Sequence, residues 1–296
     1  MVVTDPGESL VARLRQALGP DLVVSFHLGP PRANRKPVLQ LLTPRGEPVG
    51  FAKVGATELT RRLVDAEQAA LRSLAAAGLS TVEVPRVLHH EAYGDVAVLV
   101  QSALPVWEGD RTVDPAVRTA AMREVAGHAG VRTEPVGGSQ WGGELAARLD
   151  KVTDPATREL LAATLAAEAG RSLPLGAWHG DWTPWNMAVR AGRALVWDWE
   201  RCAVGVPVGF DPVHYALQEA LWRRGADPRA ATAQVLAGVP ALLAGYGLDP
   251  ADAAAVARLY LVEIAARYLL DGQAAAGARL GRLERWLLPA LGMETT

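Results

Sequence analysis

The dominant spacing of apolar residues changes near residue 104, from strands with two intervening helices to mainly helical segments, and that change constrains the fold more than any other feature. Before it, short apolar or alternating runs are separated by Gly/Pro-rich turns, a pattern typical of antiparallel strands. After it, apolar residues recur at helical spacing over most of the chain. We therefore predict an α+β fold with two lobes, a small lobe at residues 1–103 and a large, mainly helical lobe at residues 104–296.

The small lobe is predicted to combine an antiparallel five-stranded sheet with a long helix, in the order three strands, helix, two strands. The helix spans residues 57–77, with Thr57 as its N-cap and Gly78 as its stop. A shorter helix at residues 5–18 precedes the sheet and ends at Gly19-Pro20. The five strands are predicted at residues 21–28, 37–43, 48–54, 84–91 and 95–102.

The large lobe is predicted to be helical except for one island between Leu175 and Gly209. Helices are predicted near residues 114–129, 141–149, 154–169, 211–224, 228–246, 250–271 and 276–290.

Composition narrows the class of protein. The 296 residues carry a formal net charge of −2 and contain no Lys/Arg-rich block, so we expect neither a nucleic-acid nor a membrane partner. The single cysteine, Cys202, excludes an internal disulfide and a cysteine-based metal cluster. The first residues do not read as a signal peptide and no apolar run reaches transmembrane length. We expect a cytoplasmic protein. Lysine occurs only at positions 36, 53 and 151, so each lysine is of interest.

The non-helical island carries the residues suited to chemistry. Residues 178–202 read WHGDWTPWNMAVRAGRALVWDWERC, and short apolar runs place the polar residues of this segment at strand ends or in loops. Phosphoryl transfer from a nucleotide needs a carboxylate for the acceptor hydroxyl and oxygen ligands for Mg²⁺. Asp181, Asn186 and Asp198 supply this set from one segment.

Two motifs of this island resemble those of the aminoglycoside phosphotransferase and choline kinase family. HGDWTPWN at residues 179–186 is similar to the family's His-x-Asp-x-x-x-x-Asn catalytic loop, and Asp198 in VWDWE is similar to its metal-binding Asp. The resemblance implies a protein-kinase-like fold, Asp181 as the catalytic base, and Asn186 and Asp198 as Mg²⁺ ligands. It also implies ATP or GTP as the phosphoryl donor and a bracing role for His179.

The resemblance extends upstream to a Lys-Glu pair. Lys53 lies on the third predicted strand and Glu67 lies fourteen residues later on the long helix, where the family places its phosphate-contacting Lys and the ion-pair partner of that Lys. Glu58 competes with Glu67 for this role. Because Glu58 is at the helix start, the helix dipole is sufficient explanation for it, and we expect Glu67 to be the partner.

The strand that ends the small lobe is expected to lead into the hinge that binds the purine. By resemblance, we assign nucleotide contacts to Gln101, Ser102, Ala103 and Leu104. A glycine-rich phosphate loop is missing after the first strand, where Gly29 precedes two prolines. The sequence therefore leaves the triphosphate clamp unidentified.

Several residues of the island have simpler interpretations. Trp182, Trp185 and Trp199 lie in loops beside the predicted acceptor site, yet we favour a packing role for them. Asp211 precedes a predicted helix and is expected to cap it; in the family the equivalent Asp also steadies the catalytic loop. The chain contains no Gly-x-Ser-x-Gly elbow and no His-Glu-x-x-His motif, which disfavours an α/β hydrolase and a metalloprotease.

These observations predict a Mg²⁺- and nucleotide-dependent phosphotransferase that phosphorylates a hydroxyl of a small molecule such as an aminoglycoside, sugar or amino alcohol. The acceptor stays open, because Glu219, Glu263 and Asp271 form no dense acidic cluster. Two alternatives also stay open: a Ser/Thr kinase acting on a biosynthetic precursor peptide, and a catalytically silent nucleotide-binding interaction protein.

Overall fold

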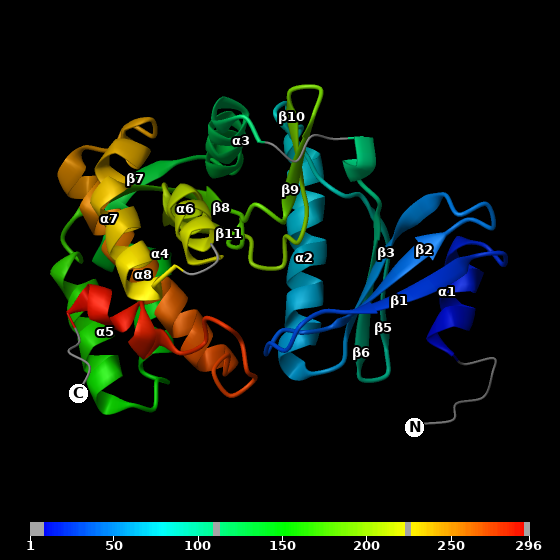
Figure 1. Cartoon of the computed structure of the whole chain (residues 1–296), viewed down its shortest axis with the longest axis horizontal. Helices are drawn as coiled ribbons and strands as arrows, with labels where there is room; N and C mark the ends of the chain where they lie inside the picture. Colours follow the sequence, from blue (N-terminus) through cyan, green and yellow to red (C-terminus); the bar gives the residue numbers. More distant parts are fainter. Residues whose placement is uncertain (1–8, 109–112, 223–225, 293–296) are drawn as a thin grey trace.

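A five-stranded antiparallel sheet and a mainly helical region lie side by side in the molecule, with α2 between them in the view of Figure 1. The computed structural model describes residues 9–108, 113–222 and 226–292. Its α+β architecture confirms the predicted fold class.

The sheet has the strand order β1-β2-β3-β6-β5, and each neighbouring pair is antiparallel. Its elements are α1 (Leu10–Leu18), β1 (Val23–Leu28), β2 (Pro37–Leu42), β3 (Pro48–Gly55), α2 (Glu58–Ala77), β5 (Val87–Tyr93) and β6 (Val96–Ser102). The predicted helix at residues 5–18 is present as α1; its first four residues lie outside the described ranges.

The two faces of the sheet have different partners because strand side chains alternate between faces. One face packs on α1 through a core that includes Leu14, Leu41, Ala52 and Val100. The opposite face packs in part on α2, where Leu71 and Leu74 meet residues of β6. The rest of that second face is free to line a cavity.

The helical region begins after β6. Its helices are α3 (Pro115–Gly127), α4 (Gln140–Leu149), α5 (Pro155–Ala167), α6 (Phe210–Trp222), α7 (Pro228–Ala244) and α8 (Pro250–Asp271). Its strands are β7 (Arg132–Pro135), β8 (Ser172–Trp178), β9 (Met187–Arg190), β10 (Arg193–Val196) and β11 (Ala203–Pro207). Short 3₁₀ turns occur at Val106–Glu108, Val136–Gly138, Leu283–Arg285 and Leu288–Leu291. Among the described helices, none has the combination of length and apolar character required to cross a bilayer.

Phe210 is at the centre of the large-lobe core. Its ring makes edge contacts with Trp141, Trp178 and Tyr260 at centroid distances of 5.5, 5.2 and 5.8 Å. Because these aromatic residues come from α4, β8 and α8, they tie three elements to the start of α6.

One strand joins the two regions. β4 (Val82–Glu83) leaves the end of α2 and pairs in parallel with β10, which also pairs with β9. Glu124 of α3 accepts hydrogen bonds from the main chain and hydroxyls of Ser80 and Thr81 just before β4. The β9–β10 hairpin is therefore attached to both regions, as the adjacent positions of β9, β10 and α2 in Figure 1 show.

Three expectations about elements are corrected. The predicted helix at residues 276–290 is wrong, because Gly277 has a φ of 76° and Pro289 lacks a donor, and only two 3₁₀ turns form there. The strand predicted at residues 84–91 is replaced by β4 and β5, with Pro85 between them. β7 and β11 flank β8 in a three-stranded sheet that the apolar pattern did not indicate.

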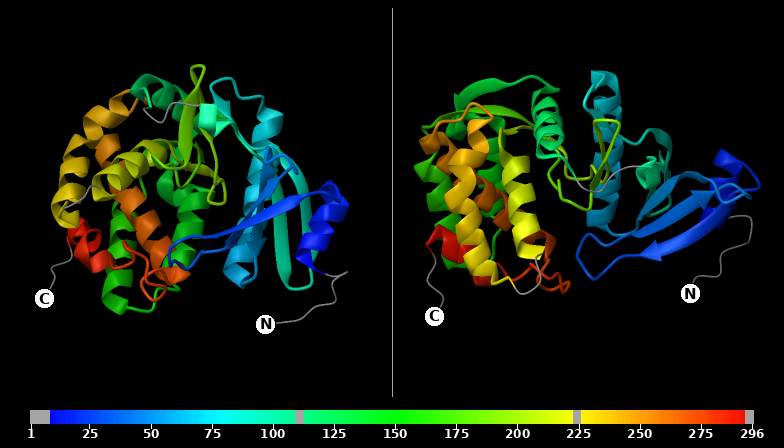
Figure 2. Two further views of the ribbon diagram at one scale, coloured as in Figure 1. Left: turned by 45° about the vertical axis from the view of Figure 1, so that its right-hand side comes forward. Right: turned by 45° about the horizontal axis from the view of Figure 1, so that its top comes forward.

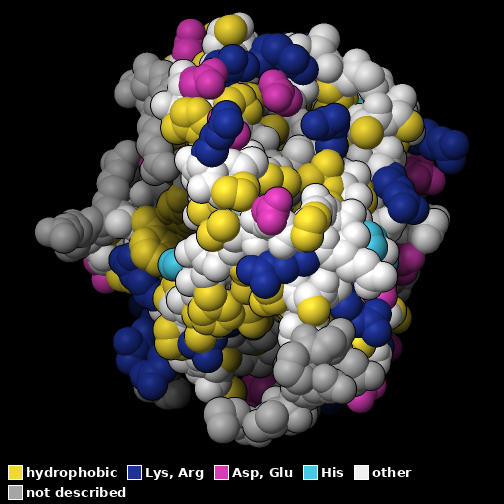
Figure 3. Space-filling model, turned by 90° about the vertical axis from the view of Figure 1, so that its right-hand side faces the viewer, with side chains coloured by type: hydrophobic (Ala, Val, Ile, Leu, Met, Phe, Trp, Pro, Cys, Tyr) yellow, Lys and Arg dark blue, Asp and Glu magenta, His cyan; other side chains and the backbone are white. Residues whose placement is uncertain are grey.

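The outer side of the small lobe has mixed character. The edge strand β1 exposes Val23, Phe26 and Leu28. Figure 3, which views the molecule from this side, shows basic and acidic side chains scattered among apolar ones.

Candidate active site

Two neighbouring cavities lie between the sheet and the helices. The larger, which we call the sheet cavity, has a volume of about 610 Å³. The smaller, the helix cavity, has a volume of about 250 Å³. They share four lining residues, Pro30, Arg32, Trp185 and Trp222, so they are two compartments of one site.

Strand register explains why Lys53 faces the sheet cavity. In the sheet, Lys53 of β3 pairs with Val38 of β2 and with Leu99 of β6. Paired residues point to the same side of a sheet. Two residues before Lys53, Phe51 pairs with Gln101, and both line the cavity. The face of the sheet that α1 leaves uncovered is therefore the face that carries the polar groups of the site.

Lys53 joins two carboxylates from different parts of the chain. Its Nζ lies 2.5 and 2.7 Å from the carboxylate oxygens of Glu67 on α2, and 2.7 Å from Asp198 Oδ1 after β10. This contact confirms the predicted proximity of Lys53 and Glu67. The competing residue, Glu58, is exposed and lies 4.0 Å from Arg62 on its own helix.

Contact among Lys53, Asp198 and Glu67 shifts the pKa of each of these side chains. Burial alone would lower the pKa of Lys53, but the carboxylates of Asp198 and Glu67 outweigh burial and hold it above its ordinary value. Burial opposes ionisation of Asp198 as well, yet the charges of Lys53 and Lys36 hold the pKa of Asp198 well below its ordinary value. Burial raises the pKa of Glu67 despite the opposing charge of Lys53. Lys53 and Asp198 are thus ionised partners at neutral pH.

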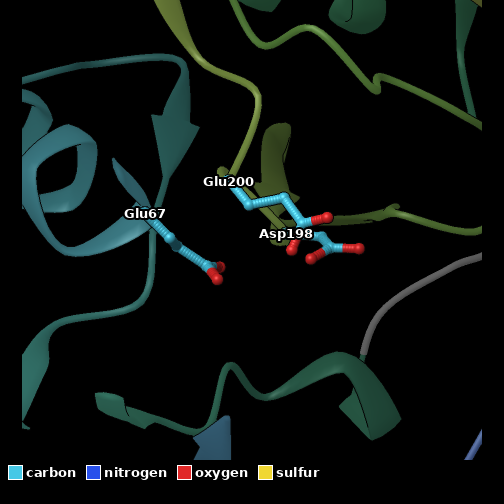
Figure 4. A group of neighbouring side chains, drawn as sticks. All are labelled: Glu67, Asp198 and Glu200. Atoms are coloured by element: carbon cyan, nitrogen blue, oxygen red, sulfur yellow. The ribbon is translucent and has the colours of Figure 1, made fainter. Parts of the chain in front are cut away.

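Asp198 has a backbone conformation that most residues avoid. Its φ is 72°, and Asp is one of the few non-glycine residues that tolerate this region. Figure 4 shows the carboxylates of Asp198, Glu67 and Glu200 directed toward a common space, and their oxygens lie within 4.8 Å of one another. A group of three carboxylates at this distance needs cations, and Lys53 is one of them.

The second cation is Lys36, which sequence reasoning did not place in the site. Lys36 immediately precedes β2, is buried, and forms an ion pair with Glu200. Asn34 donates a further hydrogen bond to Glu200 at 2.8 Å. The signal available in the sequence was the rarity of lysine, since two of the three lysines of this chain lie here.

Asn186 presents an amide oxygen beside Asp198. Its Nδ2 donates to the main-chain oxygen of Asp181 at 2.9 Å and to Asp181 Oδ2 at 3.1 Å. The main-chain oxygen of Asn186 accepts from Trp197 N at 3.1 Å, which holds this residue next to Asp198. Among the residues that the structure describes, none donates to Asn186 Oδ1. A hard cation prefers oxygen donors of the kind that Asn186 and Asp198 offer, so this pair fits Mg²⁺.

The loop that carries Asp181 is braced by His179. Its Nδ1 accepts from the main-chain N–H of Asp181 at 3.0 Å, and its Nε2 therefore donates to the Trp197 carbonyl at 3.0 Å. Burial lowers the pKa of His179 to about 4, so the ring is neutral. Asp211 accepts from the main-chain N–H groups of His179 and Gly180 at 2.7 and 3.1 Å. Burial raises the pKa of Asp211 to about 7, although these N–H groups oppose the rise.

Asp181 opens into the helix cavity with about a third of its side chain exposed. Its Oδ1 lies 3.2 Å from Nε2 of His214, a residue of α6 whose Nδ1 lies 2.9 Å from the Tyr260 hydroxyl. Burial alone would raise the pKa of Asp181, but the hydrogen bond and charge of His214 hold it below its ordinary value. Sequence reasoning missed His214; its one signal was its position three residues after Asp211.

The tryptophans divide into two groups. Trp182 and Trp199 are fully buried, and their rings lie 5.7 and 4.4 Å from that of His179. They pack the base of the loop, as favoured from the sequence. Trp185 is exposed instead, and its ring meets that of Trp222 at 5.0 Å on the wall between the cavities.

Of the four residues predicted to contact the nucleotide base, three line the sheet cavity. Gln101, Ser102 and Leu104 line the sheet cavity, and Gln101 Oε1 is buried without a hydrogen-bond partner. Ala103 is not part of the lining, and its N–H lies 3.4 Å from the Val49 carbonyl. A buried amide oxygen without a partner is costly unless a ligand pairs with it.

The connection between β1 and β2 crosses to the helical region. In Figures 1 and 2 it extends from the sheet toward the segment that follows α8. Ala33 N donates to Gln273 Oε1 at 3.2 Å, which anchors the connection there. Arg32, Arg35 and Lys36 of this connection all line the sheet cavity. A basic connection thus occupies the place where the sequence shows no glycine-rich loop.

Comparison with known proteins places this chain in a family. The model of the phosphotransferase enzyme family matches residues 51–248, and the chain belongs to that family. The family is one of phosphotransferase enzymes. No curated protein matches the chain.

Solved structures share its fold at low sequence identity. An aminoglycoside phosphotransferase APH(4)-Ia, in a ternary complex with ADP and hygromycin B, has a TM-score of 0.59 at 15% identity and covers 97% of this chain and 100% of its own. An amicoumacin kinase in complex with AMP-PNP and Ca²⁺ has a TM-score of 0.51 at 15% identity, with coverages of 88% and 86%. A GDP complex of an aminoglycoside 2′-phosphotransferase has a TM-score of 0.51 at 14% identity, with both coverages at 95%.

Proposed function

We propose that this enzyme transfers the γ-phosphoryl group of ATP or GTP to a hydroxyl of a small molecule, with Mg²⁺ bound at the nucleotide phosphates. One observation carries the proposal. The sheet cavity holds Lys53, Asn186 and Asp198, the adjoining helix cavity holds Asp181, and the two cavities meet at a shared wall. This is the arrangement that transfer between a donor and an acceptor requires.

The nucleotide occupies the sheet cavity in this proposal. Its base lies against the hinge formed by Gln101, Ser102, Ala103 and Leu104, where the unpaired oxygen of Gln101 offers an acceptor to an amino group of the purine. Lys53, held by Glu67, contacts the α- and β-phosphates.

The basic connection before β2 is the phosphate clamp that the sequence left unidentified. Arg32 and Arg35 have exposed side chains, and neither guanidinium forms a hydrogen bond or an ion pair with the described residues. The charge of Arg32 helps to lower the pKa of Asp198. Arg32 also borders the helix cavity, so it is positioned for the phosphoryl group in transfer.

Asn186 and Asp198 would hold Mg²⁺ through their oxygens. When bound, the cation neutralises the phosphate oxygens and so favours displacement at the γ-phosphorus. Glu200 already pairs with Lys36, so it contributes to the charge balance of the site rather than to this pair of ligands.

Asp181 acts on the acceptor. It receives the proton of the acceptor hydroxyl as the hydroxyl oxygen forms its bond to the γ-phosphorus. The bond from the γ-phosphorus to the bridging oxygen breaks, and the nucleoside diphosphate leaves with that electron pair. The hydrogen bond from His214 directs one carboxylate oxygen of Asp181 and lowers its pKa, so it is available as an unprotonated group.

A small molecule suits this site better than the alternatives. The β1–β2 connection and residues 277–280 both line the helix cavity, whose volume is about 250 Å³. A peptide acceptor needs an open groove. A catalytically silent role does not explain a complete set of Lys53, Asp181, Asn186 and Asp198. We further propose that the lobes divide at residues 103 and 104, and that the single cysteine reflects a cytoplasmic location.

Two conservative variants test the division of roles. Asp181→Asn is expected to lower single-turnover rates by about 10²- to 10⁴-fold on any accepted hydroxyl compound, with Mg²⁺–nucleotide affinity retained. Asp198→Asn is expected to weaken Mg²⁺-dependent nucleotide binding as well. Calorimetric titration with AMP-PNP and Mg²⁺, paired with the rate measurements, separates the two. If Asp181→Asn keeps the wild-type rate, or is the variant that loses the metal, the proposed roles are wrong.

A further inference from the structure

The charged side chains that line the helix cavity are mostly positive. The formal charges of its lining come from four arginines and one carboxylate, namely Arg32, Arg201, Arg267, Arg279 and Asp181. The carboxylate is the group assigned to the acceptor hydroxyl. Every other charged side chain that lines the cavity is therefore positive.

Nearby carboxylates do not reverse this balance. Asp271 forms an ion pair with Arg201, and after these two charges cancel, Arg32, Arg267 and Arg279 still outnumber Asp181. Glu263 accepts two hydrogen bonds from Arg148, which comes from outside the cavity, and one from the indole of Trp141. A polycationic acceptor would meet arginines where it needs free carboxylates, and this arrangement rejects it.

Two of the arginines have donors available for a ligand. Arg279 is exposed, donates one hydrogen bond to the Leu221 carbonyl at 3.0 Å, and lies over the ring of Trp222 at 4.5 Å. Arg267 donates to the Gly180 carbonyl at 2.6 Å. Stacking on an aromatic ring holds a guanidinium plane in place and leaves its edge free to bind a carboxylate or phosphate with two hydrogen bonds.

Arg267 is a buried cation beside another cation. Burial and the neighbouring Arg201 lower its pKa, although the charges of Glu263 and Asp181 oppose this decrease. Glu263 lies 4.0 Å away and is already shared with Arg148. A guanidinium remains charged under these conditions. An anion in the cavity would offset a charge that the protein itself balances only in part.

We propose that the acceptor carries an oxyanion, a carboxylate or a phosphate, in addition to the hydroxyl that is phosphorylated. The oxyanion binds Arg279 and Arg267, the hydroxyl lies at Asp181, and the rings of Trp185 and Trp222 contact the carbon skeleton. The inference rests on the proposed function, because it names the acceptor of that same site.

A matched set of acceptors tests the proposal. Glycerol, glycerate and glycerol 3-phosphate differ only in the anion, and kanamycin supplies a polycation. We expect kcat/KM with ATP and Mg²⁺ to be at least about tenfold higher for an anionic member than for glycerol or kanamycin. Comparison of glycerate with glycerol 3-phosphate identifies which oxyanion is preferred. A preference for the neutral or cationic compound overturns the proposal.

Two arginine variants localise the effect. Arg279→Gln is expected to remove most of the preference, whereas Arg282→Gln, three residues later and outside the cavity lining, is expected to leave it unchanged. A preference that survives in Arg279→Gln overturns the proposal. AMP-PNP binding is measured in parallel with each variant. Loss of nucleotide binding in the wild type contradicts the proposed function itself, whereas intact nucleotide binding without an anion preference contradicts only this inference.

If none of the four compounds is phosphorylated, fluorescence quenching tests the anion-binding proposal without an acceptor. Trp185 and Trp222 are exposed on the cavity wall, and Trp107 is exposed outside it, so in a Trp107→Phe background the iodide and caesium quenching of tryptophan fluorescence reports the charge near this wall. We expect the ratio of iodide to caesium quenching to exceed the ratio measured for free N-acetyltryptophanamide, with a smaller excess in Arg279→Gln and no change in Arg282→Gln. A ratio no higher than that of the free compound, or an unchanged excess in Arg279→Gln, overturns the proposal.

Discussion

Lys53 is the residue on which the charge balance of the site depends. It separates Glu67, which is fully buried, from Asp198. Removing one member of a buried ion pair leaves an uncompensated charge, which costs more than the pair contributes when intact. Lys53 therefore stabilises the fold in addition to its proposed contact with the phosphates.

We predict that Lys53→Met lowers the free energy of unfolding by about 3–5 kcal/mol and abolishes nucleotide binding. Lys53→Met combined with Glu67→Leu is expected to recover much of the stability but none of the binding, because the buried carboxylate is gone while the phosphate contact is still missing. Urea unfolding and AMP-PNP titration measure the two effects. Equal stability of the single and double variants would show that the pair is not coupled.

Gly180 is the residue at which the catalytic loop approaches its neighbour most closely. Its φ is 83°, and an added Cβ would lie 2.2 Å from the Arg201 carbonyl oxygen. We predict that Gly180→Ala displaces Asp181 and lowers kcat by at least about tenfold, with nucleotide affinity retained. Gly192→Ala is a matched control, since its φ of 76° is similar but an added Cβ meets nothing within 4 Å. If both variants behave alike, backbone conformation rather than crowding explains the effect.

The sequence predicted those site residues that belong to fixed motifs. Asp181, Asn186 and Asp198 lie within one short segment. Lys53 and Glu67 lie on a strand and a helix that the spacing of apolar residues predicts clearly. His214, Arg279 and Lys36 could not be recognised, because their proximity to the site arises from tertiary packing between elements distant in the chain. The unpaired oxygen of Gln101 is likewise visible only once the cavity is formed.

For helices and strands, the spacing of apolar residues predicted the elements correctly where turns lie at both ends of a segment. Gly/Pro turns bracket β1, β2 and β3, and these three strands occur where they were predicted. β4 has two residues and exists only through its pairing with β10, so no local pattern could reveal it. The predicted helix at residues 276–290 shows the opposite error, in which Leu and Ala content favoured a helix that Gly277 and Pro289 prevent.

The attachment of α3 to the loop before β4 predicts a pH-dependent stability. Although burial opposes it, hydrogen bonds from Ser80 and Thr81 lower the pKa of Glu124 to about 2. A carboxylate whose pKa is lower when folded stabilises the protein above its unfolded pKa, and this contribution is lost as pH falls from about 4.5 to about 2. Because Glu124 is partly accessible to solvent, we expect Glu124→Gln to cost only about 1–2 kcal/mol at pH 7.

Urea unfolding at pH 7 and at pH 4 measures this difference, which should shrink at the lower pH. Glu159→Gln on α5 is the control, since Glu159 is exposed and accepts no hydrogen bond in the part of the chain that the structure describes. A cost for Glu124→Gln that does not change with pH would exclude the charge of Glu124 as its cause.

For the whole molecule, the proposed nucleotide site spans both lobes, so a bound nucleotide should stabilise the entire fold. At a ligand concentration of 100 times Kd, binding to the folded state alone adds about 2.7 kcal/mol. We predict that Mg²⁺ with AMP-PNP raises the Tm of the wild type and of Asp21→Ala, a surface control, but not of Asp198→Ala. A shift of the same size in Asp198→Ala would remove this residue from the site.

The pairing of β4 with β10 has a consequence for how the chain acquires its structure during synthesis. Arg193 and Val82, which share a hydrogen bond beside this pairing, are 111 positions apart. At about 5–20 residues per second, the ribosome needs roughly 5–20 s to supply the second partner after the first. During that interval the five-stranded sheet can form and Glu124 is supplied, but the segment after α2 has no β10 to pair with. The five-stranded sheet can thus form well before the last contacts of the small lobe are available. Those contacts come from the β9–β10 hairpin, which Asn186 and Asp198 flank.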